Sequence, residues 1–274
     1  MSVPSQVAVI GGGRMGAGIA QVFLLAGASV TVQEPRAEAA RAAVARGLAI
    51  AESKGAAPGA LDRLTLGPVP AEAELVVEAV PEDPKLKVEV LSEAERRAPG
   101  AVLASNTSSL SIGELAAVLE RPGRLIGLHF FNPVPVQRLV EIVVTPETPA
   151  ELLQRAKGWV GALGKTGIVV RDSPGFASSR LGVLLGLEAM RMVEEGVAAP
   201  EDIDTAMELG YRHPMGPIRL GDLVGLDVRL AIADYLRDRL GPRFEAPEIL
   251  REKVAKGELG RKTGKGFYTW EEER

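Results

Sequence analysis

The sequence predicts a two-domain protein, in which a doubly wound α/β domain with a mostly parallel sheet precedes an all-α domain. Short apolar, strand-like segments alternate with helical segments over residues 6–170, which is typical of βαβ units. A glycine-rich turn follows the first of these strands. Beyond "RDSPGF" the strand-like segments nearly disappear and helical periodicity dominates. We therefore predict domains over residues 1–175 and 176–274.

The strands expected in the first domain are short and largely apolar, as buried parallel strands usually are. In chain order they span residues 6–10, 29–33, 75–79, 101–104, 125–129, 139–145 and 167–170. The helices that complete the alternation span about residues 15–26, 36–54, 85–97, 112–119 and 150–162. This succession places helices on both faces of the sheet.

One predicted helix of the second domain is apolar around most of its circumference. Its apolar residues are Leu181, Leu184, Leu185, Leu187, Met190 and Val193. Such a helix lies either at the centre of a bundle or in a subunit interface. We therefore expect an all-helical second domain that takes part in dimerisation.

The composition argues against several classes of protein. The 274 residues include no cysteine and only two histidines, which excludes disulfides and thiolate metal sites and argues against a histidine-rich metal site. The formal net charge of −4 argues against a protein that binds nucleic-acid backbones. The N-terminal segment has no basic region followed by an apolar core, and glycines and polar residues interrupt the charge-free run 15–33. We therefore expect a cytoplasmic protein with no metal and no membrane partner.

The turn after the first strand carries the pattern G-x-G-x-x-G. In this pattern Gly11 permits the tight turn, Gly13 lets the backbone approach a pyrophosphate, and Gly16 lets the helix pack closely on the strand. The helix N-terminus then presents free N–H groups to phosphates. Glu34 ends the next strand, where it is suited to accept hydrogen bonds from both ribose hydroxyls and to repel a 2′-phosphate. A Rossmann-like domain that binds NAD is therefore expected. The basic side chain of Arg36 leaves NADP open, and the alternative is a turn without a ligand.

Polar residues follow two further predicted strands, in the segments "SNTSS" (105–109) and "HFFNPVP" (129–135). Because ligands of an open α/β sheet bind beyond the carboxyl ends of its strands, both segments are expected on the same edge as the glycine turn. Glu141 lies in the apolar segment "LVEIVV", twelve residues after His129. A carboxylate that points inward there needs a partner. An imidazole is suitable, because Glu141 would fix the tautomer of His129 and stabilise its imidazolium form, leaving the other nitrogen to handle a proton.

Several stretches extend this pattern in one order along nearly the whole chain. They are "VAVIGGGRMGAGIAQ", "LVVEAVPEDPKLK", "ASNTSSLSI", "GLHFFNPVPVQRLVEIV", "DSPGFASSRL", "EDIDTAMELGYRHPMGPIRLGDLVGLDV" and "GRKTGKGFYTW". In this set and order they resemble the L-3-hydroxyacyl-CoA dehydrogenase family, which includes 3-hydroxybutyryl-CoA dehydrogenases. The resemblance implies an oxidoreductase with a Rossmann domain and a helical, homodimer-forming domain. It also implies NAD-dependent interconversion of L-3-hydroxyacyl-CoA and 3-ketoacyl-CoA, as in fatty-acid β-oxidation or short-chain acyl metabolism.

The resemblance also implies roles for individual residues. His129 matches the general base for the 3-hydroxyl group, Glu141 its paired acid, and Ser108 the hydroxyl that binds the reacting oxygen. Asn132 matches an active-site amide near cofactor and substrate. Ser179 stands where the family usually has an asparagine that orients substrate and catalytic groups, so the role of this position is in question. The residues expected to contact the cofactor are Gly11, Gly13, Arg14, Met15, Gly16, Glu34, Glu82, Lys87, Asn106 and Lys262.

Three functions are open at this point. The leading one is an active L-3-hydroxyacyl-CoA dehydrogenase. The second is a dehydrogenase of a free hydroxy acid or sugar acid. The third is an NAD-binding protein with a structural or sensing role, in which Ser179 reflects relaxed catalysis. His213 keeps a structural interpretation, as a loop or helix-start residue. Ser109 and Ser111 are better placed than Ser108 to cap the helix that follows.

Overall fold

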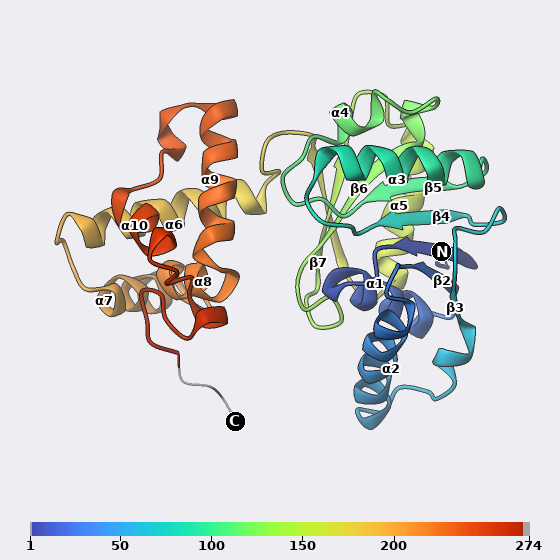
Figure 1. The fold of residues 1–274 in the computed structure, drawn as a ribbon, viewed down its shortest axis with the longest axis horizontal. Coiled ribbons are helices and arrows are strands. Elements are labelled where there is room, and N and C mark those ends of the chain that lie inside the picture. The colour runs from blue at the N-terminus through green and yellow to red at the C-terminus, as the bar shows by residue number, and fades with distance from the viewer. Residues whose placement is uncertain (1, 271–274) are drawn as a thin grey trace. The chain divides into compact units, whose positions relative to one another are not determined.

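The computed structural model describes residues 2–270, which form two compact units that meet between Phe176 and Ala177. Every strand of the sheet belongs to the first unit, and the second unit is helical (Figure 1). The observed division lies one residue after the predicted boundary.

The first unit is built on an eight-stranded sheet with the order β3-β2-β1-β4-β5-β6-β7-β8. Its strands are β1 (Gln6–Ile10), β2 (Ser29–Gln33), β3 (Leu64–Leu66), β4 (Leu75–Glu78), β5 (Val102–Ser105), β6 (Leu125–Phe130), β7 (Leu139–Val144) and β8 (Thr166–Arg171). Neighbouring strands are parallel, except that β6 and β7 are antiparallel. The mostly parallel, Rossmann-like sheet is thereby confirmed.

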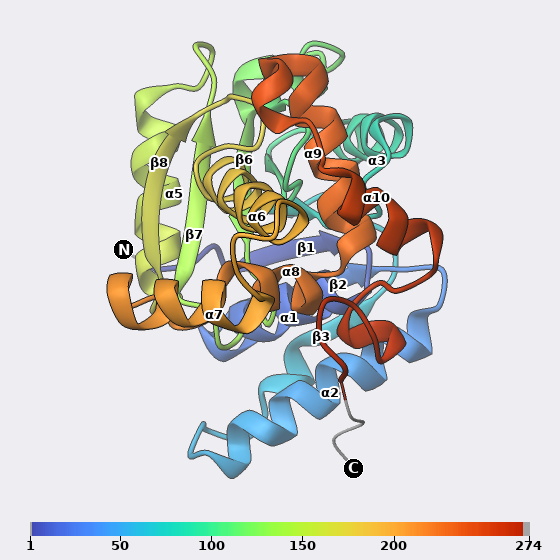
Figure 2. The same cartoon turned by 90° about the vertical axis from the view of Figure 1, so that its left-hand side faces the viewer.

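Helices cover both faces of this sheet because its strands carry apolar side chains on both sides. Val7 and Val9 of β1 belong to a core with residues of α1, α2 and α5, whereas Ala8 and Ile10 belong to a second core with residues of α3 and α4. These helices are α1 (Arg14–Leu25), α2 (Ala37–Ser53), α3 (Pro84–Arg97), α4 (Ile112–Ala116) and α5 (Ala150–Ala162). Figure 2 shows α5 alongside β7 and β8, the two strands that it contacts.

Two predicted elements differ from the structure for identifiable reasons. The strand Leu64–Leu66 was not expected, because it is only three residues long, lies at the sheet edge and has an exposed central side chain. The helix expected to reach residue 119 ends at Ala116. Beyond it the chain turns, and the carboxylate of Glu95 accepts hydrogen bonds from the N–H groups of Glu120 and Arg121.

The second unit packs around α6, the helix predicted to be apolar on most sides. Its helical segments are α6 (Ser178–Glu194), α7 (Pro200–Thr205), a π-helical turn (Ala206–Gly210), α8 (Pro217–Val224), α9 (Leu226–Leu240) and α10 (Glu248–Ala255). Leu187 and Met190 of α6 pack with Leu236 of α9 in the core of this unit. Leu181 and Leu185, on the same helix, are exposed. Among residues 2–270, no helix is long and apolar enough to cross a membrane.

Candidate active site

The glycine turn between β1 and α1 has the backbone that its sequence predicts. Gly11 has φ +95°, and an added Cβ would lie 2.7 Å from the carbonyl oxygen of Ala79. A Cβ on Gly16 would lie 1.7 Å from the carbonyl oxygen of Gly11, so the first turn of α1 can pack this closely on the glycine turn only with glycine at this position. A Cβ on Gly13, in contrast, would meet no atom within 4 Å. The position expected to face a pyrophosphate is therefore open.

Glu34, at the residue after β2, is tied to the glycine turn. Its Oε2 accepts a hydrogen bond of 2.8 Å from the N–H of Gly12, and its Oε1 accepts one of 3.2 Å from the N–H of Arg36. The hydrogen bond from Gly12 lowers the pKa of Glu34, burial opposes this, and Arg36 lowers the pKa further. Glu34 is therefore a fixed, ionised acceptor beside the turn.

A cavity of about 570 Å³ opens next to Glu34 and the glycine turn. Its lining includes Gly11, Gly13, Met15, Glu34, Ala79 and Pro81. Gly13 and the first residues of α1 border it, and the first N–H groups of a helix have no acceptor within the helix. The cavity thus combines phosphate-binding donors with a carboxylate suited to ribose hydroxyls. These features fit a dinucleotide.

His129 and Glu141 form a buried pair across the antiparallel strands β6 and β7. The two residues are direct partners in the strand register. Nδ1 of His129 lies 2.7 Å from Oε2 of Glu141, and Glu141 is fully buried. An ionised carboxylate only accepts hydrogen bonds, so this contact would place a proton on Nδ1 and leave Nε2 free to act as an acceptor. The imidazole also contacts the rings of Phe131 and Phe176, with centroids at 4.4 and 5.9 Å.

The loop that follows His129 is held from two sides. Nζ of Lys165 donates hydrogen bonds of 2.6 and 2.7 Å to the carbonyl oxygens of Val134 and Gln137. Gly18 of α1 lets the loop approach, since an added Cβ would lie 2.8 Å from the Cβ of Val134. Asn132 is exposed in this loop, two residues after the end of β6. The loop is therefore packed directly on the helix of the glycine turn.

The segment after β5 brings its polar residues to the same edge. The N–H of Phe130 donates a 2.9 Å hydrogen bond to Oδ1 of Asn106, which ties β5 to β6. Ser108 is half-buried two residues later. Ser111 caps α4, as predicted, because its Oγ accepts a 3.1 Å hydrogen bond from the N–H of Glu114. The hydroxyl of Ser108 is thus not needed to cap this helix.

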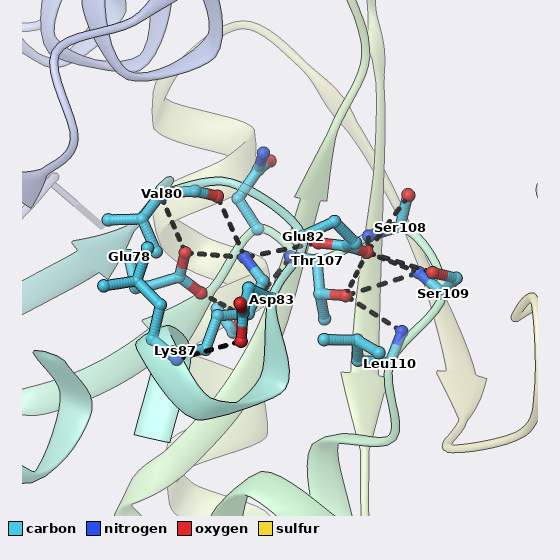
Figure 3. Close-up of polar contacts among 12 residues, drawn as sticks. Glu78, Val80, Glu82, Asp83, Lys87, Thr107, Ser108, Ser109 and Leu110 are labelled. Carbon is cyan, nitrogen blue, oxygen red and sulfur yellow. Dashed lines mark hydrogen bonds and ion pairs between the residues drawn. The ribbon is translucent and has the colours of Figure 1, made fainter. Parts of the chain in front are cut away.

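Glu82 holds the turn that carries Ser108 (Figure 3). Its Oε1 accepts hydrogen bonds from Thr107 Oγ1 at 2.6 Å, Ser108 N at 2.9 Å, Ser109 Oγ at 3.0 Å, Ser109 N at 3.2 Å and Ser108 Oγ at 3.3 Å. Burial alone would raise the pKa of Glu82, but the charge of Lys87 and the donors of this turn outweigh it and lower the pKa. Glu82 therefore stays ionised and acts as a common acceptor for the turn.

Behind Glu82 lies a buried ion pair. Nζ of Lys87 is 2.7 Å from Oε1 of Glu78, 3.2 Å from the carbonyl oxygen of Val80 and 3.3 Å from Oε2 of Glu82. The side chains of Lys87 and Glu78 are 1% and 0% exposed. Ser105 Oγ donates a 2.6 Å hydrogen bond to the other oxygen of Glu78. Neither Glu78 nor Ser105 was predicted as a site residue. An indication was present, because Glu78 ends the apolar segment "LVVE" just as Glu141 interrupts another apolar strand.

Two predicted residues belong to the helical unit, where their relation to the sheet edge remains a prediction. Ser179 is the second residue of α6 and is half-buried. Nζ of Lys262 lies 2.6 Å from Oδ2 of Asp227. Desolvation by itself would raise the pKa of Asp227, but Lys262 and nearby N–H groups outweigh it and lower the pKa. A cofactor contact from Lys262 would therefore compete with this ion pair.

Comparison with known proteins is consistent along the whole chain. Residues 6–173 match the family described as 3-hydroxyacyl-CoA dehydrogenase, NAD binding domain, and residues 175–270 match its C-terminal domain. The probable 3-hydroxybutyryl-CoA dehydrogenase of Bacillus subtilis is 41% identical over 280 residues, covering 97% of this chain and 98% of that protein. The mitochondrial hydroxyacyl-coenzyme A dehydrogenase of Sus scrofa is 40% identical, covering 96% of this chain and 90% of that protein. The crystal structure of (S)-3-hydroxybutyryl-CoA dehydrogenase PaaH1 from Ralstonia eutropha superposes with a TM-score of 0.93 at 36% identity, covering 98% of this chain and all of that one.

Proposed function

The chain belongs to the 3-hydroxyacyl-CoA dehydrogenase family, and we propose that it interconverts a short-chain L-3-hydroxyacyl-CoA and the 3-ketoacyl-CoA. Its cofactor is NAD, in keeping with the family match of the first unit. The observation that carries the proposal is the buried pair of His129 and Glu141, with 2.7 Å between Nδ1 and Oε2. A short acyl chain is supported by relatives named for 3-hydroxybutyryl-CoA.

The pair is arranged for general base catalysis. Because Nδ1–H donates to Glu141, Nε2 of His129 is left to take the proton of the substrate's 3-hydroxyl group. The imidazolium that forms is stabilised by a carboxylate already in place, and it returns the proton when the ketone is reduced. Gly11, Gly13 and Glu34 would hold NAD, which when bound would supply the hydride acceptor.

Ser108 is suited to donate a hydrogen bond to the substrate's reacting oxygen. Its hydroxyl makes the longest of the hydrogen bonds to Oε1 of Glu82, at 3.3 Å. If this hydroxyl turns toward a substrate, its N–H and the donors of Thr107 and Ser109 still hold the turn. Ser108 can thus stabilise negative charge on the oxygen without loss of the turn.

The test is NADH oxidation, followed by absorbance, with acetoacetyl-CoA as substrate and free acetoacetate as the comparison. We expect turnover of the CoA ester and a large preference for it over the free acid. Turnover of the free acid alone would favour a hydroxy-acid dehydrogenase. NADH binding without turnover of either would favour a non-catalytic protein. The variant His129→Gln is expected to bind NADH and to lose at least about 100-fold in kcat.

We also propose that the chain forms a homodimer through its helical unit. Support comes from apolar side chains of this unit that are exposed in the single chain, among them Leu181, Leu185, Leu220, Leu223 and Val228. Light scattering coupled to size exclusion measures the oligomeric state directly, and a monomer at micromolar concentration would contradict the proposal. A cytoplasmic location likewise stays a prediction, to be tested by cell fractionation.

A further inference from the structure

We propose that Glu78 is a positioning residue of the dehydrogenase reaction. It fixes the position of the turn that carries Ser108 through charged contacts from Glu78 to Lys87 and from Lys87 to Glu82. The proposal rests on the dehydrogenase function proposed above. It gives a role to a buried carboxylate that has no contact with solvent and that lies in the segment "LVVE", at the carboxyl end of β4.

The carboxylate of Glu78 is wholly engaged inside the protein. Its Oε1 accepts hydrogen bonds of 2.7 Å from both Nζ of Lys87 and the N–H of Val80, and its Oε2 accepts one of 2.6 Å from Oγ of Ser105. The residue is 0% exposed. Glu78 therefore influences a substrate or cofactor only through the groups it holds. Figure 3 shows the contacts that lead from Glu78 through Lys87 to Glu82, and from Glu82 to the serine turn.

Lys87 transmits this constraint because its ammonium group has no donor to spare. A lysine has three N–H donors, and its Nζ faces three acceptors, Glu78, the carbonyl oxygen of Val80 and Glu82. Its side chain is 1% exposed. The cofactor contact expected of Lys87 would require one of these contacts to break. The geometry instead favours an indirect role, in which Lys87 fixes the carboxylate of Glu82.

Glu82 is the point where the buried pair meets the site. Its side chain is 37% exposed, with Oε2 toward Lys87 and Oε1 toward the turn of Thr107, Ser108 and Ser109. A buried lysine held by Glu78 fixes one oxygen and thereby the rotation of the carboxylate group. If Glu78 loses its charge, Lys87 keeps Glu82 as its single carboxylate partner and is drawn toward it. The hydroxyl of Ser108 then loses its set position, and shifts of about 1 Å at a reacting group can cost up to about 100-fold in rate.

Glu95 provides a matched control on the same helix as Lys87. It is a buried carboxylate, 7% exposed. It accepts hydrogen bonds of 2.8 and 3.0 Å from the N–H groups of Glu120 and Arg121, and it contacts none of the three charged residues of the chain of contacts. Glu95→Gln therefore removes a buried charge from α3 and leaves the serine turn intact.

The experiment is a double-mutant cycle on kcat for acetoacetyl-CoA reduction, with Glu78→Gln, Ser108→Ala and the combination. Because Glu78 acts through Ser108, we expect Glu78→Gln to lower kcat about tenfold in the unchanged protein and by about twofold or less in the Ser108→Ala background. KM for NADH is expected to change less than about threefold in both. Glu95→Gln is expected to lower the melting temperature without loss of kcat.

Each outcome bears on the proposal. An equal fold-loss in both backgrounds, or full activity of Glu78→Gln, would overturn it. If Glu78→Gln does not fold, the pair Glu78→Gln with Lys87→Met removes both fully buried charges together and leaves Glu82 with the hydrogen-bond donors of the serine turn. This pair is expected to show the same dependence on Ser108. Absence of turnover by the unchanged protein would refute the proposed function and the role of Glu78 with it, whereas turnover with additive losses would refute the role alone.

Discussion

Replacing Glu141 by glutamine is the sharpest probe of the proposed base, because it removes a charge and keeps the shape. Glu141 is fully buried and lies opposite His129 in the strand register. The 2.7 Å contact between Nδ1 and Oε2 is compatible with an amide oxygen, so the orientation of the ring is kept. What glutamine cannot supply is the negative charge that faces the imidazolium once His129 has taken a proton.

The size of the effect follows from Coulomb's law. Two unit charges about 4 Å apart attract by about 4 kcal/mol at an effective dielectric constant of about 20. The amide dipole of glutamine recovers part of this energy, and each loss of about 1.4 kcal/mol is tenfold in rate. We therefore expect kcat of Glu141→Gln to fall about 100-fold, with KM for NADH little changed.

The assay is acetoacetyl-CoA reduction by Glu141→Gln, His129→Gln and the double variant. If the charge of Glu141 assists catalysis through His129, as proposed, its removal should cost almost nothing once His129 is absent. The reasoning is refuted if Glu141→Gln retains kcat within about threefold of the unchanged protein while His129→Gln is inactive. It is also refuted if the two losses multiply in the double variant.

Four further substitutions test other parts of the structure. Lys87→Met removes a charge that lowers the pKa of Glu82 against the effect of burial, so this pKa should rise. The acidic limb of the pH profile of kcat/KM should then move to higher pH. A limb that does not move would contradict the contact between Lys87 and Glu82 as a determinant of activity. Gly18→Ala should displace the loop after β6 and lower kcat, because its Cβ would collide with Val134. Gly161→Ala is the matched control in open space on α5, and it should raise the free energy of unfolding by about 0.5–1 kcal/mol. Arg229 is 9% exposed, desolvation lowers the pKa of its guanidinium to about 10, and its Nε has no acceptor within residues 2–270. Arg229→Met should therefore raise the melting temperature. A lower melting temperature would contradict this and point to an anionic partner from outside the chain.

The parts of the fold that the sequence predicts are those fixed by local chemistry. The glycine turn and the buried strands follow from backbone sterics and from runs of apolar residues. The antiparallel direction of β7 was not predicted, although a signal exists. Only residues 131–138 separate β6 from β7, and a parallel crossover needs a dozen or more residues.

The site was predicted where a polar group stands in an apolar segment and missed where tertiary packing decides. Glu141 was found because a carboxylate within a buried strand needs a partner. Glu78 is likewise a carboxylate in an apolar strand segment. It stands at the end of that segment, where charged residues are common, and was therefore not predicted. Its partner Lys87 lies on a helix with many charges, and the charge pattern does not distinguish it from solvated neighbours. Only the family resemblance singled it out, as a cofactor contact. Only the fold shows that its side chain is 1% exposed.

The order of the strands connects the proposed roles. In the sequence β4-β5-β6-β7, the two outer strands each carry a fully buried carboxylate, Glu78 and Glu141. The two inner strands lead to Ser108 and His129. Glu78 contacts the ammonium group of Lys87, and Glu141 contacts the imidazole of His129, which would become a cation on taking a proton. Hydrogen bonds between neighbouring strands hold these groups in one sheet. In the proposed mechanism, the charges that act on the reacting oxygen and its proton would thus be set before substrate binds, and stabilisation of the transition state would require little rearrangement of the protein.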